Sequence, residues 1–252
     1  MQFSYLSDAV TIKTISESEM EGVFEIEGLY SGYGLTLGNA LRRVLFSSLP
    51  GAAITQFKIK GVGHEFSTLP NVLEDTVEIG LNLKKIRFQI HTDEPQTLTL
   101  KVKGEKIVTA EDIETNSLVE LVTPELPIAT LTAKNAELEM EIRVEKGMGY
   151  VPVEARKFEK LPIGTIALDA FFSPVVRVNF TVENMRVGER TDYNRLKLEV
   201  RTDGTISPSR AVHKTSDILR DHFDKISKLE IKDITSAVVE KEEKKTAKKK
   251  KK

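Results

Sequence analysis

Residues that could catalyse a reaction or bind a metal ion are few and scattered in this sequence. There is no cysteine, and the four histidines, His64, His91, His213 and His222, share no metal-ligand spacing. No D-x-D pattern occurs, although two-metal nucleotidyl transfer needs carboxylates that hold two ions about 4 Å apart. The sequence therefore predicts no catalytic, metal or cofactor site on this chain.

Two polar segments are candidates for acid–base chemistry. His64-Glu65 follows Lys58 and Lys60, but alternation with apolar residues predicts the edge of a strand instead. Asp169 lies between apolar residues, and no base or nucleophile is paired with it in the sequence. We expect Asp169 to be a buried carboxylate that caps a turn.

Three glycines at positions 32, 34 and 38 precede an amphipathic segment and are similar to the dinucleotide-binding pattern G-x-G-x-x-G. The third glycine comes one position late, and no acidic residue follows within about 20 positions. The pattern favours a tight turn and close packing. A stand-alone nucleotide-binding protein that uses the Gly32–Gly38 loop is the alternative.

The segment after this loop predicts a helix that ends at Pro50-Gly51. Its apolar positions recur with helical spacing and form one broad stripe: Leu37, Ala40, Leu41, Val44, Leu45 and Leu49. The opposite side carries Arg42, Arg43 and Phe46. An aromatic residue beside two arginines, turned away from the core, is typical of a protein-binding surface. A solvated face with one stray phenylalanine is the alternative interpretation.

Most of the remaining sequence predicts strands with one buried face, because apolar residues alternate in four runs: 98–102, 138–144, 176–182 and 196–200. Asp203-Gly204 signals a turn after the last run. A second amphipathic helix then begins, with Ser207 as N-cap and Pro208 in the first helical position. Its apolar stripe extends from Ala211 to Leu229.

Composition indicates a globular protein, since 40% of the 252 residues are apolar and 30% are charged. No apolar run approaches a membrane span, no signal peptide is evident, and the absence of cysteine fits the cytoplasm. The net charge is −1, and residues 241–252 carry eight lysines and two glutamates, or +6, which leaves −7 elsewhere. We expect the lysine tail to be disordered and the acidic remainder to bind DNA poorly.

Four blocks of the sequence resemble one known family, the α subunits of bacterial-type RNA polymerase. They agree with the family in order and spacing and read TLGNALRRVLFSSLPGAAIT (36–55), GVGHEFSTLPNVLEDTVEIGLNLKKI (61–86), EKGMGYVPVEAR (145–156) and LDAFFSPVVRVNFTVENMRVGERTDYNRLKLEVRTDGTISPSRAV (168–212). The resemblance implies an α+β fold with two subdomains. A discontinuous dimerisation domain (1–50 plus 175–232) would contain both amphipathic helices on an antiparallel sheet. A mainly-β domain (51–174) would be inserted into it, and a lysine-rich tail (233–252) would follow.

The resemblance also implies a role and partners. The chain would form a homodimeric scaffold on which the catalytic β and β′ subunits are mounted, with magnesium on the catalytic partner and DNA reached only through the assembled complex. This places it in the cytoplasm, associated with the nucleoid and with no membrane. The positions that match large-subunit contacts are Arg42, Arg43, Phe46, Lys84, Leu168 and Ser173. The residues expected at the dimer interface are Leu37, Leu41, Val44, Leu45, Ile218, Leu219, His222, Phe223 and Ile226.

Two points qualify the match. Phe46 stands where the family pattern implies an aliphatic residue. Many family members continue into a C-terminal DNA-binding domain of about 70 residues, whereas this sequence ends in polylysine, so we expect that domain to be absent from it. A dimeric scaffold unrelated to transcription is a third alternative.

Overall fold

The computed structural model describes residues 10–156 and 161–229. One compact unit extends to Ser216, and a second begins at Asp217. The fold is α+β with antiparallel sheets, as predicted. The lysine tail predicted at 233–252 lies outside the described residues.

A four-stranded sheet joins strands from both ends of the chain. Its order is β1-β2-β15-β14, and all three pairings are antiparallel. Alternate residues of β2 and β15, such as Phe24 and Leu198, are buried because one face of the sheet is covered. The strands are β1 (Thr11–Glu17), β2 (Glu21–Leu29), β14 (Val175–Val187) and β15 (Arg190–Thr202).

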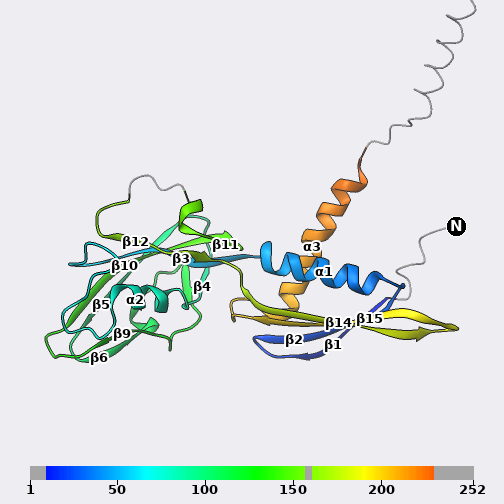
Figure 1. The fold of residues 1–252 in the computed structure, drawn as a ribbon, viewed down its shortest axis with the longest axis horizontal. Coiled ribbons are helices and arrows are strands. Elements are labelled where there is room, and N and C mark those ends of the chain that lie inside the picture. Colours follow the sequence, from blue (N-terminus) through cyan, green and yellow to red (C-terminus); the bar gives the residue numbers. More distant parts are fainter. Residues whose placement is uncertain (1–9, 157–160, 230–252) are drawn as a thin grey trace, which may run out of the picture. The chain divides into compact units, whose positions relative to one another are not determined.

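Helix α1 (Tyr33–Ser47) runs along one face of this sheet (Figure 1). A Cβ added at Gly34 would lie 2.7 Å from the Val182 side chain, and one at Gly38 would lie 2.6 Å from Phe180. Glycine therefore lets the helix approach β14 closely. Both glycines lie within α1, so the predicted loop at 32–38 is wrong, and the nucleotide-binding alternative loses its site.

A five-stranded antiparallel sheet in the middle of the chain has the order β12-β3-β10-β5-β7. Its strands are β3 (Pro50–Ile59), β5 (Gln96–Lys103), β7 (Ile113–Glu114), β10 (Glu137–Met148) and β12 (Thr165–Ala167). Three two-stranded pairings accompany it: β4 (Phe88–Ile90) with β8 (Val119–Leu121), β6 (Lys106–Thr109) with β9 (Pro127–Leu131), and β11 (Tyr150–Val151) with β13 (Ala170–Phe171).

Helix α2 (Thr76–Leu83) packs into the core of this middle part. It begins with a capping box, in which the Asp75 side chain accepts from the backbone N–H of Glu78 and Glu78 accepts from that of Asp75. The core that α2 joins is large and apolar, and its fully buried members include Phe57, Ile59, Ile79, Leu83, Phe88, Leu100, Leu138 and Ile142. This core fixes the end of α2, where Lys84 is the C-cap.

The chain passes from the four-stranded sheet to the five-stranded sheet near residue 50 and returns near residue 175, where the sequence predicts domain boundaries. The strands of the four-stranded sheet come from residues 11–29 and 175–202, and those of the five-stranded sheet come from residues 50–167. Both sheets nevertheless belong to the first compact unit. The boundaries of the dimerisation and inserted domains therefore stay a prediction.

Helix α3 (Pro208–Ser227) begins where the sequence predicts it, with Pro208 as its first residue. The N–H of Ala211 donates to the carbonyl oxygen of Ser207 over 2.9 Å. Two other predictions are corrected. Strand β3 ends at Ile59, so His64-Glu65 lies in a loop and not at a strand edge. Strand β14 forms as expected, but Val176 remains 56% exposed, so its apolar face is covered only in part.

Candidate protein-docking surface

The side of α1 that faces away from the sheet carries the first candidate site. Arg43 and Phe46 are exposed there, Phe46 by 39%, and Arg42 is exposed at the edge of this side, next to the sheet. The Arg42 guanidinium donates to Asn39 Oδ1 over 3.2 Å and lies 5.2 Å from the centre of the Phe180 ring. Its cation–π contact anchors one arginine of the pair to β14. Arg43 makes no ion pair within the described part of the chain and is open to a partner.

The second candidate site is an ion pair between the end of α2 and the segment that joins β12 to β13. Lys84 Nζ lies 3.2 Å from Asp169 Oδ2, and the backbone N–H of Val153 donates to Asp169 Oδ1 over 3.0 Å. The Val153 hydrogen bond, together with Lys84 and against partial desolvation, lowers the pKa of Asp169 below its ordinary value. Desolvation and the Asp169 charge raise the pKa of the nearby Tyr150. Asp169 therefore stays ionised at neutral pH and orders three separate segments.

Asp169 is placed partly as expected. It accepts at Val153, the first residue of the 3-10 turn Val153–Ala155, and so caps a turn. Its side chain is 33% exposed, so the expectation of a buried carboxylate is wrong. The carboxylate and its lysine partner remain accessible to a second protein.

Leu168 and Ser173, the other two predicted contacts, differ in accessibility. Leu168 is half-buried, and its side chain lies against Gly80 of α2. Ser173 is only 6% exposed, and its hydroxyl lies 3.4 Å from both the N and the O of Val175. The side chain itself is therefore largely covered within one chain, and its contact with a large subunit stays a prediction. Ser173 holds the chain where it enters β14.

The two candidate sites are linked through Gly149. A Cβ added at Gly149 would lie 3.4 Å from the carbonyl oxygen of Ser47, so the backbone between β10 and β11 and the end of α1 approach closely there. Gly149 has φ +64, a conformation that favours glycine. The next residue is Tyr150, whose pKa is raised by desolvation and by the nearby Asp169 charge. The end of α1 and the segment beside Tyr150 therefore lie close together at Gly149.

Comparisons with known proteins show the family of the chain. Residues 57–173 match the profile of the RNA polymerase Rpb3/RpoA insert domain. The DNA-directed RNA polymerase subunit alpha of Alkaliphilus oremlandii is 44% identical over 238 residues, which cover 94% of this chain and 75% of that protein. The chain belongs to the family of DNA-directed RNA polymerase α subunits. The match with the subunit of Symbiobacterium thermophilum is 51% identical over 210 residues, 83% of this chain and 66% of that protein.

A third relative sets the extent of the match. The α subunit of Moorella thermoacetica is 52% identical over 202 residues, which cover 80% of this chain and 64% of that protein. The chain thus spans slightly less than two thirds of the length of the Symbiobacterium and Moorella subunits. The inserted segment predicted at 51–174 contains the whole of the matched insert-domain region.

In this member of the α-subunit family, the residues predicted at the dimer interface divide into two groups. On α1, Leu41 and Leu45 are 6% and 0% exposed within one chain, so they belong to its core, and their part in a dimer interface stays a prediction. Leu37 and Val44 are half-buried. On α3, Ile218 and Leu219 are half-buried, and the exposed residues are His222, Phe223 and Ile226.

Sequence reasoning missed two exposed apolar groups near the Lys84–Asp169 pair. Tyr150 and Phe171 pair across β11 and β13, are 52% and 50% exposed, and have ring centres 5.2 Å apart. Val77 and Leu81 are exposed on α2 and lie one helical turn apart. The i, i+4 spacing of Val77 and Leu81 was a readable signal, because it puts them opposite the buried Ile79 and Leu83.

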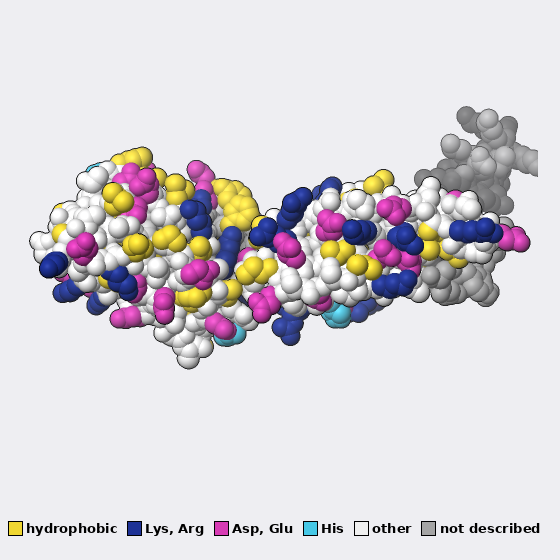
Figure 2. Space-filling view, turned by 90° about the horizontal axis from the view of Figure 1, so that it is seen from below, with side chains coloured by type: hydrophobic (Ala, Val, Ile, Leu, Met, Phe, Trp, Pro, Cys, Tyr) yellow, Lys and Arg dark blue, Asp and Glu magenta, His cyan; other side chains and the backbone are white. Residues whose placement is uncertain are grey.

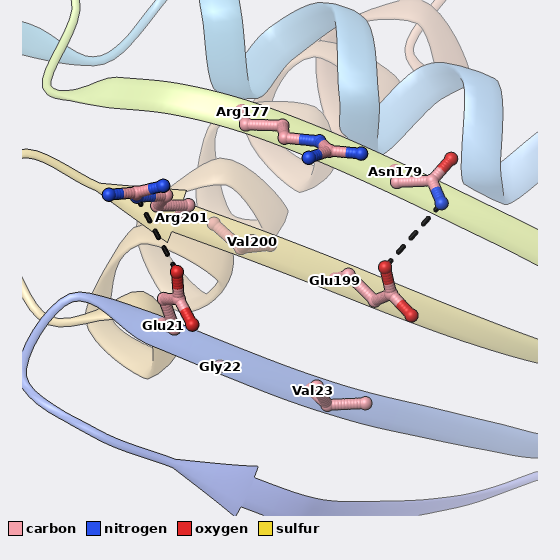
Figure 3. A pocket seen from close by; sticks show the side chains of 8 residues that line it. All are labelled: Glu21, Gly22, Val23, Arg177, Asn179, Glu199, Val200 and Arg201. Carbon is pink, nitrogen blue, oxygen red and sulfur yellow. Dashed lines mark hydrogen bonds and ion pairs between the residues drawn. The ribbon is translucent and has the colours of Figure 1, made fainter.

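The described residues give little support to a small-molecule site. A groove of about 230 Å³ lies on the outer face of the four-stranded sheet, lined by side chains of β2, β14 and β15 (Figure 3). Arg201 pairs with Glu21 over 3.5 Å, and Asn179 donates to Glu199 over 3.5 Å. Because the charged groups that line it pair largely with one another, this groove has the character of a solvated sheet face.

Charge and hydropathy add two observations. Figure 2 shows basic and acidic side chains interspersed over the face that it draws, with no continuous positive field. Such a surface offers little attraction to a phosphate backbone. Among the described residues, no helix is both long and apolar enough to span a membrane.

Proposed function

We propose that this chain acts as the assembly scaffold of a DNA-directed RNA polymerase: a homodimer on which the catalytic β and β′ subunits are mounted. The observation that carries the proposal is the division of α1 into two sides. One side is fixed in the core by Leu41 and Leu45, and the other presents Arg43 and Phe46 to solvent. A rigid helix with an exposed arginine and aromatic residue is suited to binding a protein.

The second patch extends this surface to the middle of the chain. Lys84, Leu168 and Asp169 lie together there, next to the exposed Tyr150. The apolar residues supply area that a partner can bury, and the ion pair supplies directional contacts. A large subunit that bridges α1 and this patch would be held at both ends.

Self-association is the role proposed for α3. Phe223 and Ile226 are 62% and 65% exposed, one helical turn apart. An exposed apolar ridge of this kind is stabilised when a second copy covers it, and a two-fold interface brings the same ridge of both copies together.

Catalysis is assigned to the partners. Within residues 10–156 and 161–229, no three His, Asp or Glu residues are placed to hold a metal ion. We therefore propose that the chain carries no active site or cofactor, that magnesium is bound by a large subunit, and that DNA is reached only through the complex. The site of action would be the cytoplasm, in association with the nucleoid.

The test is capture of the purified β subunit from the same organism. Arg42→Ala/Arg43→Ala should leave the helix intact, because alanine is the better helix former and both arginines are exposed. Loss of one arginine hot spot costs about 2 kcal/mol, which corresponds to roughly 30-fold weaker binding. The double variant should therefore be a folded protein that captures β at least this much more weakly.

Arg177→Ala is the matched control. Arg177 is also exposed, but it lies on the outer face of the sheet, away from α1 (Figure 3). Its loss should not change capture of β. Undiminished capture by the folded double variant, or an equal loss in the Arg177 variant, would contradict α1 as the docking site.

A further inference from the structure

The first turn of α1 is not capped by its own sequence. The N-cap residue is Gly32, which has φ +86 and no side chain that could accept from the free N–H groups of the turn. These N–H groups need acceptors, because the first four of a helix have no partner within it. An N-cap side chain ordinarily accepts from the second or third helical residue.

Asn194 of β15 supplies the missing acceptor from across the fold. Its Oδ1 accepts from the N–H of Gly32 over 2.8 Å and from the N–H of Gly34, the second helical residue, over 3.3 Å. Its Nδ2 donates to Asn184 Oδ1 over 3.2 Å. Both the oxygen and the NH2 group of the amide are therefore hydrogen-bonded, and these partners set the orientation of the side chain.

Asn194 is buried and tightly packed in this position. It is 6% exposed, and a Cβ added at Gly34 would lie 3.0 Å from its own Cβ. The glycine lets the first turn of the helix reach the asparagine, and the asparagine holds it there. Burial makes this bond costly to lose, because an unpaired buried polar group cannot turn to water.

We propose that Asn194 is the positioning residue for the docking side of α1. By fixing where the helix begins and how it is rotated on the sheet, it fixes the direction in which Arg43 and Phe46 point, further along the same rigid element. The contact of Arg42 with Phe180 then holds the middle of the helix. This inference rests on the proposed function, since it assumes that the exposed side of α1 binds β.

The N-terminus of helix α3 is also capped by a side chain from a distant strand, but this cap is exposed. Its second residue, Ser209, donates its N–H to Glu17 Oε1 of β1 over 2.9 Å, but Glu17 is exposed. Water can replace that carboxylate at little cost, whereas it has poor access to Asn194. The buried cap is therefore specific to the helix with the proposed docking side.

The experiment compares three variants of the full chain. Asn194→Ala removes the acceptor. Asn194→Asp retains an oxygen at the same place and adds a charge that suits a helix N-terminus; it loses the donor to Asn184, whose amide can turn to donate instead. Val200→Ala, a buried position on the same strand, lowers stability without touching the cap. Each is measured by hydrogen exchange of the amides in residues 32–36 and by its Kd for purified β.

Asn194→Ala should raise exchange of these amides about fivefold and weaken binding of β by a similar factor. Asn194→Asp should restore both, and Val200→Ala should change neither the local exchange nor the Kd. Unchanged exchange in Asn194→Ala overturns the cap. If Asn194→Ala shows faster exchange but binds β with a Kd no higher than that of Val200→Ala, the positioning role is overturned. No binding of β by the unaltered chain refutes the proposed function, and with it the positioning role, while the exchange data still decide whether the cap exists.

Discussion

The apolar side of helix α1 is buried or half-buried, whereas that of α3 is exposed from His222 onward in the described residues. On α1, Leu41 and Leu45 are at most 6% exposed. On α3, the buried residues end at Thr215, and Phe223 and Ile226 further along are more than 60% exposed. Both apolar stripes have helical spacing, but among the described residues only the stripe of α1 is covered by other parts of the chain.

The difference separates two uses of an amphipathic helix. The apolar side of α1 contributes to folding, which leaves its polar side rigid and free to bind a different protein. Beyond Thr215 the apolar side of α3 is half-buried or exposed in the described residues, and we propose that a second copy covers it. Changes in α1 should therefore alter stability or β binding, and changes late in α3 should alter the oligomeric state.

The largest expected effect is on association. Phe223→Asp places a charge in the proposed interface, and an unpaired buried charge costs roughly 3 kcal/mol or more, or about 100-fold in the dimer dissociation constant. Because Phe223 is 62% exposed within one chain, the monomer should remain folded. Sedimentation equilibrium and circular dichroism measure the two properties together.

Lys225→Asp is the control for this change. It introduces the same side chain into the same turn, on the polar side of α3, and should leave the dimer intact. A dimer that survives Phe223→Asp, or unfolding of the variant monomer, would show that the exposed ridge is not the interface.

The next effect is on stability. Leu45→Ala removes a side chain that is 0% exposed, and such changes cost about 2–5 kcal/mol through lost burial and the cavity left behind. Urea unfolding should show this loss. The dimer dissociation constant, measured well below the unfolding midpoint, should change little. If dimerisation weakens more than folding, the stripe of α1 faces a second copy after all.

Much of the fold follows from periodicity in the sequence. Alternation at Leu98, Leu100 and Val102 identifies β5, and the Ser207-Pro208 pair identifies the start of α3. These signals are local, because they depend on the geometry of one element. The family blocks add the order of the elements and the residues that match partner contacts.

What the sequence did not reveal depends on contacts between distant segments. In the sequence, the glycines before the apolar stripe predict a loop. In the structure, Gly34 and Gly38 are part of the helix and lie against side chains of β14. The sequence around Ser173 does not indicate that its side chain is buried. Nothing near Asn194 in the sequence indicates that it caps a helix 160 positions away. The spacing of apolar residues also identifies the apolar face of a helix, but it does not show whether other parts of the chain cover that face.

The smallest effect concerns Asp169, which pairs with Lys84 and should not influence α3. Because its folded-state pKa is below the ordinary value of 3.8, the folded state binds fewer protons than the unfolded state, and the stabilisation is present above that pH. It is lost as pH falls through the folded-state pKa. Asp169→Asn retains an acceptor for Val153 but no charge for Lys84.

The Tm of the native chain should therefore exceed that of Asp169→Asn by a small, constant margin from pH 5 to 7, and the margin should close below about pH 4. The dimer dissociation constant of Asp169→Asn should match that of the native chain at pH 7, because no contact of Asp169 involves α3 among the described residues. A margin that opens between pH 5 and 7 would point to a different titrating group. A weakened dimer would mean that the two helices are coupled, against the division of roles inferred above.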